Sequence, residues 1–243
     1  MDQQAMMTAF LGEKRLEPFL DAAARDSERA SNLYRWNMKL GGSFHTQISY
    51  VEVATRNAIT KAISDWNEQQ PLPQAQGTFG RDWTAPGGLA DPLYGQMSHT
   101  VRRARKYALQ ESQNRHPSHP RHKDSPTHDD IVAQLTFGNW TSLFTDRNVP
   151  SRREQLWTDA LRFAFPNADQ SLTGLNKLTY QLETLRRLRN RAAHHENVLA
   201  VNVSSRLNMT LSVLRAIDKR FPDWVMAAST LRRIAREDPR RLW

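Results

Sequence analysis

Residues 171–196 read SLTGLNKLTYQLETLRRLRNRAAHHE, and this stretch decides the fold class of the chain. Its apolar residues recur at steps of three and four, at Leu175, Leu178, Leu182, Leu185 and Ala192. Such steps place side chains on one face of an α-helix, because 3.6 residues make one turn. The stretch therefore predicts a long amphipathic helix that buries one stripe.

Helical spacing continues on both sides of this stretch, and no segment shows the strict alternation of a half-buried β-strand. The expected helices cover residues 16–38, 43–66, 92–113, 131–135 and 152–165. Gly41-Gly42 is expected to break the first from the second. Asp129 or Asp130 suits the N-cap of the fourth, and Gly138-Asn139 is expected to interrupt the helical pattern after it. The sequence predicts an all-α fold.

Two regions depart from this pattern. Residues 68–130 contain an irregular insert rich in proline and glycine, which Trp83 is expected to anchor. Its second part, NRHPSHPRHKDSPTHDD, is expected to be a mobile surface loop. A basic helical segment follows at about 215–243. We expect one domain over residues 1–243.

The composition points to a polyanionic partner. The chain has 243 residues with 34 Lys and Arg against 25 Asp and Glu, a formal net charge of +9. Such a surplus favours nucleic acid, because basic side chains displace phosphate counterions. Without cysteine, disulfides and thiolate sites are excluded. No apolar run approaches the roughly 20 residues of a membrane span, and the start lacks a signal-peptide pattern, so a cytoplasmic protein is expected.

The end of the predicted long helix carries a polar motif. Asn190 and His194 are four residues apart and share a helix face, while Arg189 lies about 140° around the helix from His194. Histidine transfers protons near neutral pH, arginine holds phosphate, and asparagine orients either group. A histidine, an arginine and an asparagine together suit RNA cleavage in which the 2′-hydroxyl is the nucleophile. The alternative is structural: Arg189 and Arg191 cap the helix, where its dipole favours cations.

Four separated stretches carry a resemblance to a known family. They are LYRWNMKLGGSFHTQISYVEVATRN at 33–57, FGRDW at 79–83, IVAQLTFGNWTSLF at 131–144 and LRRLRNRAAHHENV at 185–198. In these stretches the chain resembles the abortive-infection Abi-like family, with phage-defence members of the AbiD and AbiF type. That family belongs to the HEPN superfamily of all-helical RNA-processing proteins, so the resemblance implies a HEPN-like helical bundle.

The resemblance also implies an activity. Arg189, Asn190 and His194 match the superfamily signature Arg-polar-x-x-x-His, as phosphate clamp, orienting group and proton-transfer residue. The implied protein is a metal-independent endoribonuclease that leaves 2′,3′-cyclic phosphate and 5′-hydroxyl ends. It would act as a toxin in phage defence, as a homodimer restrained by a small structured antitoxin RNA. Two alternatives stay open: a noncatalytic RNA-binding protein, and a HEPN regulatory subunit partnered with a nucleotidyltransferase.

Further residues are candidates for supporting roles. His195 is the second choice for proton transfer, and Arg191 is a candidate for a catalytic or supporting role. Glu52, Arg56 and Asn57 form a second polar cluster, interpreted either as an i,i+4 ion pair or as a supporting shell. The expected RNA-binding residues are Arg102, Arg103, Arg105, Lys106, Arg232, Arg233 and Arg236. Bases are expected to stack on Trp83, Trp140 or Tyr107, although Trp140 is more typical of a core.

No metal and no cofactor are expected. The histidines of the insert invite a metal site, and they are His116, His119, His122 and His128. Pro117, Pro120 and Pro126 prevent a regular helix there, and no cysteine or carboxylate is placed to complete a ligand set. A basic loop that meets the RNA backbone is the preferred interpretation.

Overall fold

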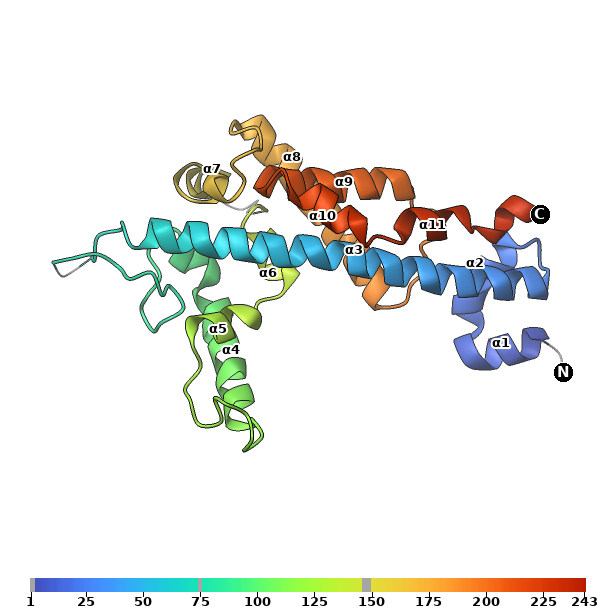
Figure 1. Cartoon of the computed structure of the whole chain (residues 1–243), viewed down its shortest axis with the longest axis horizontal. Helices are drawn as coiled ribbons and strands as arrows, with labels where there is room; N and C mark the ends of the chain where they lie inside the picture. Colours follow the sequence, from blue (N-terminus) through green and yellow to red (C-terminus); the bar gives the residue numbers. More distant parts are fainter. Residues whose placement is uncertain (1–2, 74–75, 146–149) are drawn as a thin grey trace. The chain divides into compact units, whose positions relative to one another are not determined.

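The computed structural model describes residues 3–73, 76–145 and 150–243, which fold as helices joined by turns and loops (Figure 1). Across these ranges there is no β-strand, only an isolated bridge between Pro71 and Thr78. The prediction of an all-α fold is confirmed. No helix in the described ranges combines the length and the apolar character needed to cross a membrane.

Helices follow one another along the described residues. They are α1 (Gln3–Leu11), α2 (Glu13–Ala22), α3 (Ser27–Asn67), α4 (Leu93–Gln113), α5 (His128–Ala133), α6 (Phe137–Ser142), α7 (Pro150–Asp159), the 3-10 helix η1 (Leu161–Ala164), α8 (Leu172–Ala193), α9 (Val203–Ile217), α10 (Phe221–Ala227), α11 (Leu231–Arg236) and the 3-10 helix η2 (Pro239–Leu242).

The chain forms two compact units, each built from segments far apart in the sequence. Unit 1 holds the described residues up to Val51, together with Glu183–Arg215 and Arg220–Trp243. Unit 2 holds the described residues of Glu52–Leu182, together with Ala216–Lys219. Helices α3, α8 and α9 contribute residues to both. The expectation of one domain stays a prediction.

Gly41 and Gly42 lie inside α3, so the expected break at these glycines is wrong. Both have ordinary negative φ, and a Cβ added at either would meet no described atom within 4 Å outside the local helix backbone. A glycine costs a helix only about 1 kcal/mol relative to alanine. Leu40, Phe44 and Ile48 are fully buried around the pair. Burying each contributes roughly 1.5–3 kcal/mol, which outweighs the glycine penalty.

The single helix expected over residues 16–38 is also wrong, because the chain turns between α2 and α3. Ala24 and Arg25 have φ of 49° and 65°, in the left-handed region that ends a helix. Asp26 then starts α3, since its Oδ1 accepts hydrogen bonds of 2.9 Å from the N–H groups of Glu28 and Arg29. A side-chain cap of this kind fixes where a helix begins.

Three expected helices correspond to observed ones. The helix expected over 92–113 is α4, and the helix expected over 171–196 is α8. The helix expected over 152–165 ends early, because α7 stops at Asp159 and η1 follows it. The basic C-terminal segment is helical, but it is divided among the end of α9, α10, α11 and η2.

Within unit 1, the first part of α3 packs against the C-terminal helices. Trp36 Nε1 donates to the carbonyl of Ile234 at 2.8 Å, and Ser229 Oγ donates to Gln47 Oε1 at 2.7 Å. The bonded residues are 198 and 182 positions apart in the sequence, so local sequence patterns could not predict these bonds. They hold the α10–α11 region against α3.

Within unit 2, Asn67 organises the irregular connection between α3 and α4. The Asn67 side chain is fully buried and makes three hydrogen bonds, donating to the carbonyls of Gly80 and Gly88 and accepting from the Ala90 N–H. Trp83 is also fully buried, and its ring packs edge-on against Trp140 and His128. The expectation that Trp83 anchors the insert is confirmed.

The proline-rich segment after α4 is a surface loop, called the tied loop below because ion pairs and hydrogen bonds hold it; its expected mobility stays a prediction. Asp130 accepts hydrogen bonds from both terminal nitrogens of Arg121, at 3.1 and 2.5 Å, and pairs with Arg115 at 3.3 Å. Arg115 also donates to the carbonyl of Arg121 at 2.9 Å. The Arg121 guanidinium and the Thr127 N–H lower the pKa of Asp130 well below its usual range.

The starts of α5 and α6 correct two smaller expectations. Thr127 is the N-cap of α5, and Asp130 stands at the third helical position, where it completes a capping box. Thr136 and Asn139 form the same box at the start of α6. Asn139 therefore starts a helix with Gly138 inside it, and neither interrupts the pattern.

Candidate functional site

The polar motif lies at the C-terminal end of α8, in unit 1. Arg189 and Asn190 belong to the last turns of the helix and are half-buried, whereas His194 follows the helix and is exposed. The His194 N–H donates to the Asn190 carbonyl at 2.9 Å, so the helical path continues to His194. Asn190 and His194 therefore share a face one turn apart. Arg189, on the preceding position, makes its own side-chain contacts within the protein.

His195 ends the helix in a left-handed conformation, with φ of 55°. The Glu196 N–H donates to the Arg191 carbonyl at 2.9 Å, and the His195 N–H donates to the Ala192 carbonyl at 3.1 Å. This pair of bonds is a Schellman motif, in which the residue after the helix adopts positive φ. The turn takes His195 off the helical path, so the geometry favours His194 for a role shared with Asn190.

Arg191 holds this helix end together. Its guanidinium donates to the Asn197 carbonyl, and its Nε lies 3.7 Å from Glu196 Oε2. These contacts assign Arg191 a supporting role for the chain that carries the two histidines. The same contacts agree with the capping alternative raised for this arginine.

Asn37 holds the segment after the histidines, a role that was not predicted from the sequence. The Asn37 side chain is 1 % exposed, and its Oδ1 accepts a 2.7 Å hydrogen bond from the buried Val198 N–H. The available signal was a polar residue on the buried side of a helix, next to Trp36. A buried amide in such a place needs a partner.

Arg240 contacts the same segment from the C-terminal 3-10 helix. Its Nη2 donates to the Leu199 carbonyl at 3.3 Å, and its guanidinium lies 5.4 Å from the centre of the Trp36 ring. Asp238 pairs with Arg240 at 2.7 Å. Burial alone would raise the pKa of Asp238, but the hydrogen bonds from Arg240 lower it overall. Arg240 is therefore a packing residue of unit 1.

The second polar cluster lies on α3 in unit 2. Arg56 Nη2 stands 3.9 Å from Glu52 Oε1, which is the i,i+4 ion pair of the plainer interpretation. Glu52 is buried, Arg56 is half-buried, and Asn57 is exposed. A contribution of these residues to the site stays a prediction.

The basic residues of α4 divide into two groups. Arg102, Arg103 and Lys106 are exposed. Arg105 is half-buried, and its Nε and Nη2 both donate to the Thr84 carbonyl. Arg105 thus ties α4 to the insert, and the other three remain the candidates for phosphate contact.

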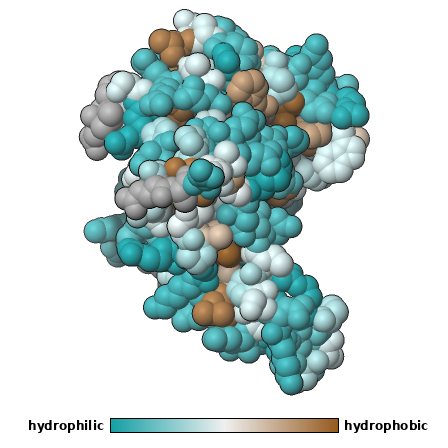
Figure 2. Space-filling model, turned by 90° about the vertical axis from the view of Figure 1, so that its left-hand side faces the viewer, coloured by the Kyte–Doolittle hydropathy of each residue, from teal (hydrophilic) through white to brown (hydrophobic). Residues whose placement is uncertain are grey.

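At the C-terminal end, Arg232, Arg233 and Arg236 are exposed on α11. Arg233 pairs with Glu237 at 2.7 Å, which offsets part of its charge. The face drawn in Figure 2 is mostly hydrophilic, with hydrophobic residues in small scattered groups. The exposed arginines of α11 suit contact with a polyanion, because phosphate contacts dominate nucleic-acid affinity.

Two of the three expected stacking residues are buried in the core. Trp83 and Trp140 are fully buried, which corrects their assignment as stacking platforms and agrees with a core role for Trp140. Tyr107 is 50 % exposed and remains a candidate. The sequence reading missed Trp224, which is exposed on α10 and packs edge-on against Tyr50.

The histidines of the insert have local partners. His128 Nδ1 lies 2.9 Å from Asp82 Oδ1, His122 Nδ1 lies 2.8 Å from the Arg115 carbonyl oxygen, and His119 Nδ1 accepts from the Arg121 N–H. In the part of the chain that the structure describes, no three His, Asp or Glu side chains are grouped so that they could hold a metal ion.

Comparison with known proteins identifies the family. The model of a family described as Abi-like protein matches residues 9–200. The matched range includes Arg189, Asn190 and His194, and it ends before α9. No curated protein and no solved structure matches the chain. Since the family model covers more than half of its length, the chain belongs to the Abi-like protein family.

Proposed function

We propose that this Abi-like protein is a HEPN-type endoribonuclease of the AbiD/AbiF type, which cleaves RNA without a metal ion and acts as a cytoplasmic toxin in abortive infection. Family membership supports the abortive-infection role. The nuclease activity rests on the chemistry of the motif at the end of α8.

In the proposed reaction, the 2′-hydroxyl of a nucleotide attacks its own 3′ phosphorus. One base takes the hydroxyl proton, and one acid protonates the 5′ oxygen as its bond to phosphorus breaks. His194 performs one of these transfers, Arg189 holds the phosphate as its charge grows, and Asn190 orients the phosphate or the histidine. The products are a 2′,3′-cyclic phosphate and a 5′-hydroxyl.

A second copy of the chain completes the site in this proposal. Cleavage needs two proton transfers, and the chain carries one good copy of the motif. Two motifs meeting in a homodimer would supply both the base and the acid. Light scattering tests this point, because a monomer at micromolar concentration with and without RNA contradicts a shared site.

The observation that carries the proposal is that His194 is exposed, while the segment after it is held in place. His194 is exposed one turn from Asn190, while the chain after it is held by Arg191, Asn37 and Arg240. Such support suits catalysis, because a reacting group must be held close to its productive geometry. A basic toxin also needs restraint, and we propose a small structured RNA as its inhibitor.

The test compares the wild type with His194→Ala on RNA in EDTA. We expect only the wild type to cleave and to leave cyclic-phosphate ends. His99→Ala, which changes an exposed histidine on α4, is the matched control and should cleave like the wild type. Equal cleavage by His194→Ala and the wild type would contradict the assigned role.

A noncatalytic RNA-binding protein is the second candidate. It is favoured by the exposed cations of α4, which can hold phosphate without the motif. In the same assay, RNA binding by wild type and variant with cleavage by neither would establish this alternative.

A further inference from the structure

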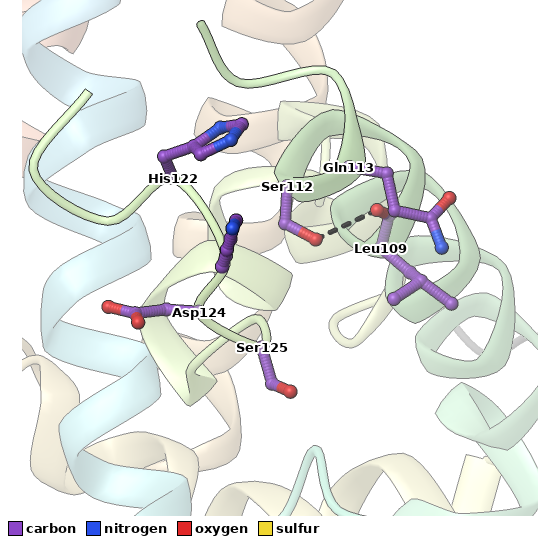
Figure 3. Close-up of a pocket in the computed structure, with 7 residues that line it drawn as sticks. Leu109, Ser112, Gln113, His122, Asp124 and Ser125 are labelled. Carbon is purple, nitrogen blue, oxygen red and sulfur yellow. Dashed lines mark hydrogen bonds between the residues drawn. The ribbon is translucent and has the colours of Figure 1, made fainter. Parts of the chain in front are cut away.

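Unit 2 contains an open hollow between the end of α4 and the tied loop that follows it (Figure 3). Its volume is about 360 Å³, at the lower end of the roughly 300–1,000 Å³ of small-molecule sites. The residues that line it are Leu109, Ser112, Gln113, His122, Lys123, Asp124 and Ser125. Neither the motif on α8 nor the second polar cluster contributes to it.

Hydrogen bonds and ion pairs within the loop and with Asp130 hold the loop side of the hollow in place. Arg115 donates to the carbonyls of Arg121 and Asp124, and Asp130 pairs with both arginines. His122 is fixed by the 2.8 Å contact of its Nδ1 with the Arg115 carbonyl. Because a carbonyl only accepts, Nδ1 carries the proton and Nε2 is left as the second polar atom of the ring. The hollow is therefore preorganised, which lowers the entropy lost on binding.

The lining combines polar and apolar surface, and its two charged side chains, Lys123 and Asp124, have opposite signs. The Gln113 amide makes no hydrogen bond with another described residue. Asp124 points away from the α4 side chains in Figure 3, and its carboxylate lies 3.8 Å from Arg121 Nε. Leu109 is 46 % exposed and offers an apolar surface. An apolar surface beside an amide and an imidazole suits the face and edge of a nucleobase.

Positively charged side chains lie along the face of α4 that ends at this hollow. Arg102, Lys106, Leu109 and Gln113 follow at steps of four, three and four, so they lie within about 60° of one another around the helix. All four are exposed. Two cations on this stripe, and Lys123 across the hollow, can contact phosphates on either side of a base that lies between them.

We propose that this hollow holds one unstacked nucleotide of the RNA that runs along α4, and that it gives the protein a base preference. The Gln113 amide and His122 contact the edge of the base, Leu109 packs on its face, and Lys106 and Lys123 contact the flanking phosphates. This inference deepens the proposed function, since it takes RNA as the ligand.

The test measures binding in the His194→Ala background, so that no RNA is cut. Fluorescence anisotropy with short labelled poly(A), poly(C) and poly(U) should show one homopolymer bound at least about tenfold more tightly than the weakest, as expected for base-edge hydrogen bonds. Gln113→Ala should reduce this ratio to within about threefold. Gln110→Ala is the matched control: Gln110 is exposed on the same helix outside the hollow, so its loss should leave the ratio unchanged.

Two further variants separate base contact from phosphate contact. Gln113→Glu keeps the shape of the side chain and removes its amide donor, so it should also reduce the preference. Lys123→Ala should weaken all homopolymers by a similar factor and reduce the salt slope by about one. Lys177→Ala removes an exposed lysine of α8 and should do neither.

The outcomes distinguish the two proposals. Equal binding of all homopolymers, or an unchanged ratio in both Gln113 variants with an unchanged melting temperature, overturns the nucleotide site even if the wild type cleaves RNA. A base preference that Gln113→Ala removes, with no cleavage by the wild type, supports the nucleotide site and contradicts the nuclease.

Discussion

Replacing Asn37 by alanine should destabilise the chain that carries the candidate histidines. Asn37 is 1 % exposed and its partner Val198 is fully buried, so the variant leaves a buried N–H without its acceptor. An unsatisfied buried donor costs about 1–3 kcal/mol. The truncated side chain also leaves a small void. We therefore expect a loss of about 2–3 kcal/mol in the free energy of unfolding.

Urea denaturation and thermal melting measure this loss. For a chain of this length, about 1 kcal/mol lowers the melting temperature by roughly 2–4 °C, so a decrease of about 4–12 °C is expected. Asn32→Ala is the matched control, because Asn32 is exposed on the same helix and should change stability by less than about 0.5 kcal/mol. If both variants have the same stability, the Asn37–Val198 bond does not hold this segment.

Four other substitutions test the fold and the basic surface. Gly42→Ala should raise stability by about 0.5–1 kcal/mol in urea denaturation, because the residue is helical with open space for a Cβ; destabilisation would contradict a continuous α3. Asp130→Asn should destabilise at pH 7 relative to an Asp129→Asn control, by about 1–3 kcal/mol. The folded-state pKa of Asp130 is lowered, so this stabilisation is present above the unfolded pKa of about 4, and the difference between the two variants should shrink as pH falls below it. Arg105→Ala should lower the melting temperature, because Arg105 holds α4 to the insert. Arg102→Ala should lower the affinity for RNA, because Arg102 is exposed. The reverse result would refute the division of the α4 cations into supporting and exposed ones.

The helices were largely predictable because burial imposes a period on the sequence. The leucines of α8 follow one stripe and were identified correctly. A different signal, the glycine pair Gly41-Gly42 taken as a helix breaker, predicted a break where there is none. Glycine permits a helix end but does not force one, and the buried side chains around the pair decide the outcome.

The contacts that support the motif were beyond prediction. Asn37 reaches Val198 over a separation of 161 residues, and Arg240 reaches Leu199 over 41. Local patterns cannot pair such residues. Likewise, a positive φ at His195 has no signal in a sequence that lacks glycine there. The motif itself was found because its residues lie within one helical turn and a half.

The tied loop after α4 has a consequence for proteolysis. Trypsin cleaves after arginine and lysine, and it needs a stretch of chain that can detach and extend into its active site. The loop contains Arg115, Arg121 and Lys123 and looks like an easy target. Because the Asp130 carboxylate binds both arginines, detaching the loop must first break those ion pairs. We therefore expect Asp130→Asn to be digested faster than the wild type at these positions, because the loop detaches more easily once these ion pairs are weakened.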